Sequence, residues 1–343
     1  MSKIRIAIFG AAGYSGEELI RLSMRHPDVE LQAITSRSYA GQGIEEVFPR
    51  FHGCGLTFCQ PDVETIAAQC EVAFLALPHG LAAEYARPLV AAGLTVIDVS
   101  ADFRLKNLQT YAKYYKQEHP APELMAQAVY GQPETHREEL RNAKLIACAG
   151  CYVTSVILPT APILATGLGK SSGIIAACMS GVSGAGRKVD LPFIFPECNE
   201  SVRPYGIVGH RHLPEMEQEL AAAARVDSLS MTFTPHLVPI NRGINSMIFM
   251  ESNKSDLCQA DVGAALHEAY ADEPFVRVLP HGKLPDTKHV TMTNHCEIGY
   301  DYDDRTGRIL LSSAIDNLTK GASGQAIQCM NLALGLDERS GLT

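Results

Sequence analysis

The 343-residue sequence lacks any apolar run that approaches a membrane span, which takes about 20 residues. Its first residues carry charges at Lys3 and Arg5 and too few apolar residues after them for a signal peptide. Basic residues are also outnumbered, since 29 basic and 38 acidic residues leave a net charge of -9. Such a chain repels phosphate backbones and anionic lipid in bulk. We therefore expect a cytoplasmic protein that binds neither nucleic acid nor membrane.

Cysteine is too sparse for a disulfide scaffold, since only ten are spread over the whole chain. Cys148 and Cys151 have C-x-x-C spacing, but no second C-x-x-C motif accompanies them to complete a zinc site. Cys54 and Cys59 lie further apart, within a glycine-rich loop. We expect free thiols in a reducing compartment and no metal site.

The order of elements predicts an α/β fold. The length and the 46% apolar composition favour about two domains. A short apolar strand at 4–9 leads into a glycine turn and a helical pattern at 17–26, and a second strand follows at 29–35. Further buried strands are expected at 71–78, 94–100 and 144–149. Nearly continuous apolar strands alternating with helices are typical of a Rossmann-type, doubly wound parallel sheet.

The pattern of predicted elements changes after Cys151, where strands follow one another with fewer helices between them. The expected strands are 173–180, 229–238, 243–252, 290–299 and 308–316. This pattern predicts a second, α+β domain with a mixed sheet. We place the first domain at 1–150, completed by a C-terminal helix in 318–343, and the second at 151–317.

Gly10, Gly13 and Gly16 form a G-x-x-G-x-x-G turn between the first strand and the first helix. Without side chains, such a turn lets a pyrophosphate approach the backbone amides at the helix N-terminus. The spacing differs from the commoner G-x-G-x-x-G, and a tight turn without a ligand is the alternative.

The end of the second strand reads Thr35-Ser36-Arg37-Ser38. A site selective for NAD usually has a carboxylate here for the ribose 2′-hydroxyl, and none is present. A guanidinium and two hydroxyls suit a 2′-phosphate instead. NADP is therefore the predicted cofactor, with an ordinary surface arginine as the alternative interpretation of Arg37.

The two cysteines of the C-x-x-C motif occupy different settings. Cys148 falls in an apolar strand, where a thiol usually behaves as a small buried hydrophobe. Cys151 follows Gly150 just before a helix, whose dipole favours the thiolate. A redox pair would be expected after the first strand of a small domain, so a nucleophilic Cys151 is the better interpretation.

A thiolate beside a nicotinamide can add to an acyl group whose carbon then exchanges a hydride with the cofactor. This chemistry needs an acid/base near neutral pH, and His210 and His212, with Arg211 between them, precede a predicted helix. A metal pair is the alternative for H-x-H spacing, but no acidic ligands accompany it. A second glycine-rich loop at 181–188 could approach a flat ring and, through Arg187, an anion.

Together these segments resemble the N-acetyl-γ-glutamyl-phosphate reductase family nearly end to end. The segments that carry the resemblance are GAAGYSGEEL, SADFRL, GCY, GVSGAGRK, HRHLPE, FTPHLVPINRGI and KGASGQAIQ. The resemblance implies an NADP-dependent enzyme of arginine biosynthesis that reduces an acyl phosphate through a cysteine thioester. It also implies a homo-oligomer, a dimer or tetramer, whose second domain supplies catalysis and the subunit interface.

The resemblance assigns roles position by position. It makes Cys151 the nucleophile and His210 the acid/base. The cofactor residues that it implies are Gly10, Gly13, Tyr14, Ser15, Gly16, Ser36, Arg37, Ser38, Ser183, Gly184 and Asn317. The candidates for binding the small acyl-phosphate substrate are Arg104, Arg211 and His212.

One departure from the family concerns Cys148 and Ala149, which stand where relatives commonly have Asn-Pro. Which groups bind the acyl phosphate is therefore open. Three other interpretations also stay open: an enzyme like aspartate-semialdehyde dehydrogenase acting on another acyl phosphate, a thiol-disulfide protein using Cys148 and Cys151, and a dinucleotide sensor with an inert Cys151.

Overall fold

The structure is a computed structural model and describes residues 2–343. The chain divides into two compact units. Unit 1 comprises the residues up to 112 together with 117–149 and 322–343, and unit 2 comprises 113–116 and 150–321. The predicted functional boundaries at residues 150 and 317 stay a prediction.

Unit 1 is built on a sheet with the strand order β3-β2-β1-β4-β5-β7-β6, in which the described pairs are parallel. This confirms the Rossmann-type sheet. Its elements are β1 (Ile4–Phe9), α1 (Tyr14–Ser23), β2 (Val29–Thr35), α2 (Ile44–Val47), β3 (Phe58–Cys59), α3 (Val63–Gln69), β4 (Val72–Leu75), α4 (Ala82–Ala91), β5 (Thr95–Asp98), β6 (Ala128–Gly131), α6 (Pro133–Leu140), β7 (Leu145–Cys148) and α12 (Gly324–Ala333), and α5 (Leu108–Tyr115) runs from unit 1 into unit 2.

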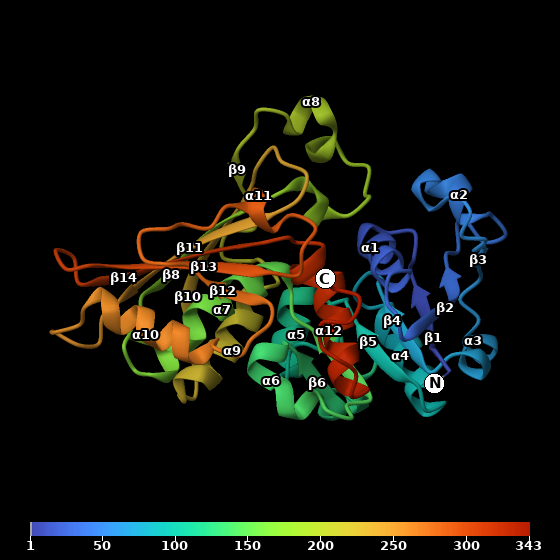
Figure 1. Ribbon diagram of the computed structural model, residues 1–343, viewed down its shortest axis with the longest axis horizontal. Helices are drawn as coiled ribbons and strands as arrows, with labels where there is room; N and C mark the ends of the chain where they lie inside the picture. Colours follow the sequence, from blue (N-terminus) through green and yellow to red (C-terminus); the bar gives the residue numbers. More distant parts are fainter. Residues whose placement is uncertain (1) are drawn as a thin grey trace. The chain divides into compact units, whose positions relative to one another are not determined.

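Two apolar clusters cover the two faces of this sheet. On one face, Leu19 of α1 and Ile327 of α12 pack with the strand residues Ile8 and Ile146. Helices α3 and α4 cover the other face. Helices α1 and α12 lie side by side although they stand at opposite ends of the sequence (Figure 1). Burial on both faces explains why the strands are nearly continuous apolar runs.

Unit 2 is built on a mixed sheet with the order β12-β13-β14-β11-β8-β10-β9. The pairs β8–β10 and β12–β13 are parallel, while β8–β11, β11–β14, β13–β14 and β9–β10 are antiparallel. Its elements are α7 (Cys151–Ala165), β8 (Ile174–Ser180), α8 (Phe195–Cys198), β9 (Arg203–Pro204), α9 (Leu213–Ala224), β10 (Met231–Leu237), β11 (Ile244–Glu251), α10 (Gln259–Ala269), β12 (Val276–Val278), α11 (Thr287–Val290), β13 (Cys296–Asp303) and β14 (Arg308–Ile315).

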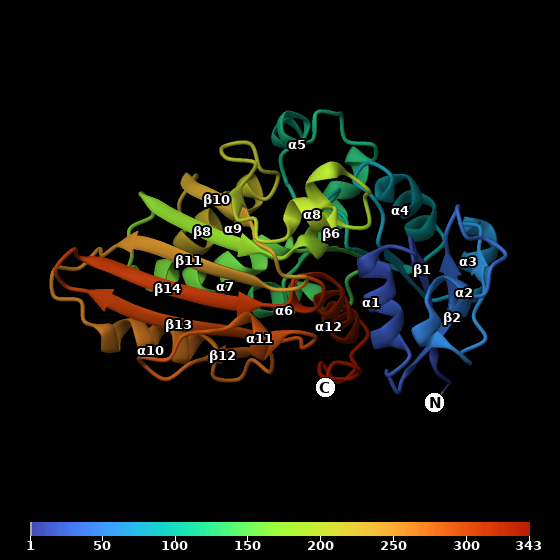
Figure 2. The ribbon, with the colours of Figure 1, turned by 90° about the horizontal axis from the view of Figure 1, so that it is seen from above.

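Helices α7, α9 and α10 lie on one face of this sheet (Figure 2). Val153 of α7, Met216 of α9 and Leu266 of α10 are fully buried in the cluster that joins them to the strands. Helix α7 is buried almost throughout, which explains why its sequence is apolar on every side. The expectation of a second, α+β domain with a mixed sheet is confirmed.

The predicted strand at 290–299 is wrong over its first half. Residues up to Val290 form the short helix α11, and β13 begins at Cys296. The side chain of Asp286 caps α11 by accepting from the Lys288 N–H at 3.0 Å. A carboxylate of Asp316 accepts from the Met292 N–H at 2.6 Å and bends the chain before the strand. These two side-chain hydrogen bonds outweigh the strand propensity of the β-branched residues in the segment.

Between β8 and α9 the chain makes a long excursion, defined here as residues 187–209. Its exposed apolar side chains are Val189, Leu191, Ile194, Phe195, Val202, Tyr205, Ile207 and Val208. Large apolar groups on a surface typically mark a site of interaction. Across residues 2–343, no helix combines the length and the apolar character that crossing a membrane requires.

Candidate active site

The predicted nucleophile, Cys151, is the first residue of α7, and its side chain is partly exposed. Gly150 caps the helix with an extended conformation, and its carbonyl accepts from the Thr154 N–H at 2.9 Å. The first turn of α7, which is described throughout, holds no acidic side chain. The first N–H groups of a helix have no intrahelical acceptors and carry a partial positive charge. A helix N-terminus of this kind favours the charged form of a cysteine, and the thiolate at Cys151 stays a prediction.

The other cysteines near this one are buried. Cys178 of β8 is fully buried, and burial raises the pKa of its thiol to about 12. Cys148, at the end of β7, is also fully buried and belongs to the core of unit 1. Within residues 2–343 no cysteine forms a disulfide. The differing exposure gives Cys151, rather than its neighbours, access to a substrate.

The predicted acid/base, His210, is enclosed by aromatic rings. The ring centroids of Tyr152 and Tyr205 lie 5.6 Å from that of His210, and those of Phe233 and His212 lie at 5.3 and 4.9 Å. Tyr152 follows Cys151 in α7, so Cys151 and His210 share this tyrosine as a neighbour. Edge-to-face contacts of this kind hold a ring in one orientation.

The hydroxyl of Tyr205 donates to that of Tyr152 at 2.9 Å, and the Tyr152 hydroxyl donates to the His236 carbonyl at 3.3 Å. Although Tyr205 is 38% exposed, its hydroxyl points inward to this bond. Burial raises the pKa of Tyr205 to about 12, and the nearby Cys151 sulfur adds to the rise. Both tyrosines therefore stay neutral and lie close to the sulfur.

His210 is neutral at physiological pH. Burial lowers its pKa to about 4, and the positive charge of Arg211 contributes further. Its Nδ1 accepts from the His212 N–H at 3.1 Å, so the neutral ring carries its proton on Nε2. His210 can thus offer a hydrogen-bond donor at Nε2.

Two residues at this site escaped the sequence-based assignment. The buried carboxylate of Glu215, on α9, accepts from the Gly150 N–H at 2.9 Å and ties α9 to the turn before Cys151. Gly321 packs against Cys151, because a Cβ at Gly321 would lie 2.8 Å from the Cβ of Cys151. Both fall within segments that carried the family resemblance, but nothing in their spacing indicated contact with residue 150 or 151.

The structure brings three predicted cofactor residues of unit 2 together. The Asn317 amide donates to the Ser183 hydroxyl at 3.0 Å, and its oxygen accepts from the Gly243 N–H at 2.7 Å. Gly184 lies beside them, since a Cβ there would be 3.8 Å from the Asn317 amide nitrogen. Ser183 and Asn317 are buried, so their direct contact with a cofactor stays a prediction.

The three substrate candidates have different environments. Arg211 is exposed and lies over the ring of Tyr115, 5.7 Å from its centroid, within unit 2. His212 caps the start of α9 beside His210. Arg104 belongs to unit 1, is buried, and donates to the Val99 carbonyl at 2.9 Å. The Arg104 guanidinium is thus already bonded to the backbone of unit 1, and its role in binding substrate stays a prediction.

In unit 1 the glycine turn lies between β1 and α1. A Cβ at Gly10 would lie 2.3 Å from the Ala76 carbonyl oxygen, and one at Gly16 would lie 2.5 Å from the Gly10 oxygen. Gly10 also has a φ of +75°, which L side chains rarely adopt. A Cβ at Gly13, by contrast, would meet only the Gly10 oxygen at 3.6 Å. Gly10 and Gly16 close the turn. Gly13 donates its N–H to the Gly10 carbonyl at 3.1 Å and leaves space beside its Cα at the helix N-terminus.

Tyr14 and Ser15, the other predicted residues of this turn, open α1. The Ser15 carbonyl accepts from the Ser323 hydroxyl at 2.8 Å, which attaches the turn to the segment before α12. Tyr14 is partly exposed. An exposed ring and an open helix N-terminus are compatible with a pyrophosphate at this turn.

At the end of β2, Ser36, Arg37 and Ser38 follow Thr35 directly. Arg37 and Ser38 are exposed, and Ser36 is half-buried. Arg37 Nη2 donates to the Tyr85 hydroxyl at 2.9 Å. The Thr35 carbonyl accepts from the Ala11 N–H at 3.0 Å, so the end of β2 is bonded to the glycine turn. This group of donors and hydroxyls fits a phosphate.

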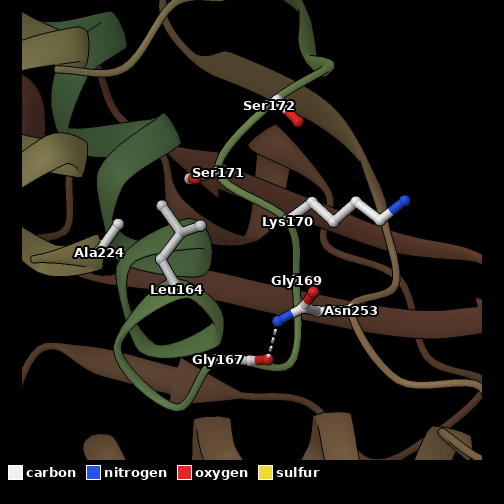
Figure 3. A pocket seen from close by; sticks show the side chains of 8 residues that line it. All are labelled: Leu164, Gly167, Gly169, Lys170, Ser171, Ser172, Ala224 and Asn253. Carbon is white, nitrogen blue, oxygen red and sulfur yellow. Dashed lines mark hydrogen bonds between the residues drawn. The ribbon is translucent and has the colours of Figure 1, made fainter. Parts of the chain in front are cut away.

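Within the described residues, no group of His, Cys, Asp and Glu side chains has the arrangement of a metal site. A surface hollow of about 280 Å³ lies near the C-terminal end of α7 (Figure 3). Leu164, Lys170 and Asn253 are among its lining residues, and Asn253 donates to the Gly167 carbonyl at 3.3 Å. It lies about 20 Å along α7 from Cys151, given 1.5 Å per residue, and includes none of the predicted site residues.

Comparison with known families matches both parts of the chain. Residues 5–143 match the family described as "Semialdehyde dehydrogenase, NAD binding domain", and residues 151–317 match "Semialdehyde dehydrogenase, dimerisation domain". A protein of Akkermansia muciniphila named N-acetyl-gamma-glutamyl-phosphate reductase is 51% identical over 346 residues, covering 100% of this chain and 99% of the relative. One of the same name from Pseudomonas syringae pv. syringae is 47% identical, covering 99% and 98%.

Solved structures share the fold at lower identity. The aspartate semialdehyde dehydrogenase II of Vibrio cholerae, complexed with ASA, has a TM-score of 0.75 at 19% identity and covers 97% of this chain and 98% of that chain. The aspartate semialdehyde dehydrogenase of Candida albicans, solved with NADP, has a TM-score of 0.70 at 17% identity, covering 96% and 98%. At these identities the likeness concerns the fold alone.

Proposed function

The chain belongs to the N-acetyl-γ-glutamyl-phosphate reductase family, and from this premise we propose that it reduces N-acetyl-γ-glutamyl phosphate to N-acetylglutamate semialdehyde and phosphate, using NADPH. The identity of about half its residues with reductases of this name, over nearly full length, supports the substrate. The sequence-based identification of the family and of an oxidoreductase is confirmed. The matched NAD-binding domain establishes a nicotinamide cofactor.

We propose Cys151 as the nucleophile. Its thiolate attacks the acyl carbon, the bond from that carbon to the phosphate oxygen breaks, and phosphate leaves as a thioester forms on the sulfur. The observation that carries this assignment is a partly exposed cysteine as the first residue of a 15-residue helix. The same helix N-terminus supplies amides that can stabilise the oxyanion at the acyl carbon. When bound, the reduced cofactor supplies the hydride for that carbon.

His210 is the proposed proton donor. The acyl oxygen gains negative charge when the carbon becomes tetrahedral, and Nε2–H of a neutral imidazole can stabilise it by hydrogen bonding. The rings of Tyr152, Tyr205 and Phe233 hold the imidazole for this purpose. Arg211 and His212 are the proposed partners of the substrate phosphate or carboxylate, because they are cationic or polar groups next to His210. Arg104 is a further proposed partner of the substrate phosphate or carboxylate.

We propose that unit 1 holds NADP through two groups. The space beside the Gly13 Cα, with Gly10, Tyr14, Ser15 and Gly16 around it, suits the pyrophosphate. Arg37, flanked by Ser36 and Ser38, suits the 2′-phosphate, since no carboxylate stands at the end of β2. Ser183, Gly184 and Asn317 of unit 2 are the proposed residues on the nicotinamide side.

We also propose a homo-oligomer, a dimer or tetramer, that works in the cytoplasm. The match of residues 151–317 to a dimerisation domain supports self-association through unit 2. The exposed apolar side chains of the excursion belong to the same unit and are candidates for burial in that assembly. The compartment is supported by the free thiols.

The reverse reaction tests this function directly. Purified protein is supplied with NADP, inorganic phosphate and N-acetylglutamate semialdehyde, and NADPH formation is followed by absorbance. We expect a rate that depends on phosphate and that greatly exceeds the rate with aspartate semialdehyde. A preference for aspartate semialdehyde would assign the chain to the other acyl phosphate, and disulfide exchange without nicotinamide would favour the thiol-disulfide alternative.

A further inference from the structure

Tyr85 of α4 connects the ends of two strands in unit 1. Its hydroxyl accepts from Arg37 Nη2 at 2.9 Å, just after the end of β2. Its ring packs against Phe9, the last residue of β1, with 5.2 Å between centroids and a 48° interplanar angle. Phe9 is fully buried and immediately precedes the glycine turn. One side chain thus contacts both regions proposed to bind the cofactor.

The chemistry of the partner distinguishes Arg37 from other arginines of this unit. Arg87, two positions after Tyr85 on the same helix, pairs with the Glu123 carboxylate at 2.7 Å and donates to the Pro120 carbonyl at 2.8 Å. Its charge is neutralised by that carboxylate. Among residues 2–343, Arg37 forms no ion pair; its hydrogen bond goes to the neutral Tyr85 hydroxyl, and the carboxylate of Glu84 acts on it only as the smallest electrostatic contribution. Its positive charge is therefore available to a ligand.

A neutral partner solves a physical problem of phosphate recognition. A free arginine side chain loses rotamer entropy when a ligand immobilises it. A carboxylate partner would restrict the side chain but would compete with the phosphate for its charge. A tyrosine hydroxyl restricts one N–H and leaves the charge, and the other N–H groups of the guanidinium fork can still bind two phosphate oxygens.

We propose that Tyr85 is a positioning residue for cofactor selectivity, which holds the Arg37 guanidinium ready for the 2′-phosphate without neutralising it. This inference rests on the proposed preference for NADP. It predicts that the Tyr85 hydroxyl contributes to the use of NADPH and not to that of NADH, because NADH lacks the 2′-phosphate. Packing of the Tyr85 ring on Phe9, in contrast, serves both cofactors equally.

The test is a double-mutant cycle with Tyr85→Phe, Arg37→Ala and the double variant, in which kcat/KM is measured with NADPH and with NADH. Tyr85→Phe keeps the ring on Phe9, so the fold is preserved, and a thermal melt checks this. We expect Tyr85→Phe to lower kcat/KM for NADPH about fivefold, through KM, and to leave NADH unchanged. In the Arg37→Ala background the same change should have no further effect. Arg87→Ala is the matched control and should leave the NADPH-to-NADH ratio unchanged.

The outcomes separate this inference from the proposed function. If Arg37→Ala weakens NADPH and NADH equally, the NADP assignment itself fails. If Arg37→Ala is selective for NADPH but Tyr85→Phe is not, or if Tyr85→Phe acts equally in the Arg37→Ala background, the positioning role alone is overturned. A direct titration of NADPH and NADH binding to the same variants gives the second readout, independent of turnover.

Discussion

The glycine turn of unit 1 and the Cys151 centre of unit 2 both lie where a strand or loop enters a helix, yet they depend on opposite features. The turn depends on side chains that are absent, since a Cβ at Gly16 would lie 2.5 Å from the Gly10 oxygen. The Cys151 centre depends on side chains that are present, a sulfur at the helix start and an enclosed imidazole. In the proposed function the two helix N-termini would stabilise an anion in two ways, one by leaving space for a pyrophosphate and the other by favouring a thiolate.

The largest effect should come from removing the sulfur nucleophile. Cys151→Ser should lower kcat by about 10³-fold or more, because a serine hydroxyl is not ionised at a helix N-terminus near neutral pH. Binding of NADPH should stay close to that of the wild type. Cys148→Ala, three positions earlier, is the matched control and should keep nearly full kcat. Full turnover by Cys151→Ser would remove the proposed role of that residue.

Loss of the imidazole should come next. His210→Ala should lower kcat by about 10²-fold, the usual contribution of a positioned proton donor, with a smaller change in KM. His267, exposed on α10, is the matched control, and His267→Ala should retain activity. Equal activity of the two variants would place the proton donor elsewhere and would leave unit 2 with the sulfur as its sole essential side chain.

Two alanine substitutions in the glycine turn sharpen the contrast within unit 1. Gly16→Ala forces backbone atoms apart, so it should cost about 2 kcal/mol of unfolding free energy. Gly13→Ala has room for its Cβ and should leave the unfolding free energy nearly unchanged while raising KM for NADPH. Urea denaturation and initial rates measure the two quantities. A Gly13→Ala protein with unchanged KM would contradict the proposed approach of the pyrophosphate to the space beside Gly13.

The smallest effect concerns pH. Burial lowers the pKa of His210 from 6.5 to about 4, so the unfolded chain binds a proton that the folded chain rejects between these values. The free energy of unfolding should therefore fall as the pH is lowered from 6.5 towards 4. This fall should be smaller in the His210→Ala protein. Burial also lowers the pKa of His295 to about 4. His295 therefore contributes a loss of stability over the same pH range in both proteins. Urea denaturation at pH 7 and pH 5 measures the difference, and equal losses in the two proteins would show that His210 is not buried as a neutral ring.

The parts of the molecule that the sequence predicted well are those set by local pattern. Apolar runs bounded by glycine and proline mark the strands of unit 1, and the position of Gly10, Gly13 and Gly16 between a strand and a helix indicates the turn. Cys151 could be separated from Cys148 because a strand interior and a helix start are distinguishable in sequence. The structure agrees, with Cys148 fully buried and Cys151 partly exposed.

Contacts between distant segments could not be read from the sequence. Gly321 lies 170 positions after Cys151 in the chain, yet a Cβ on it would lie 2.8 Å from that residue. Glu215 contacts the Gly150 amide from α9, and Tyr205 contacts Tyr152 from the excursion 187–209. The positions of both segments depend on the whole sheet of unit 2. The error at 290–299 has the same origin, because Asp316 of a remote segment bends the chain there.

The central claim is that the Cys151 sulfur takes the acyl group from the phosphate. The most direct measurement mixes the protein with N-acetyl-γ-glutamyl phosphate in the absence of any nicotinamide, quenches with acid and maps the peptides by mass spectrometry. The account predicts release of one phosphate per active site and an N-acetylglutamyl thioester on the peptide that contains Cys151. Phosphate release without that adduct, or an adduct on another residue, would contradict it.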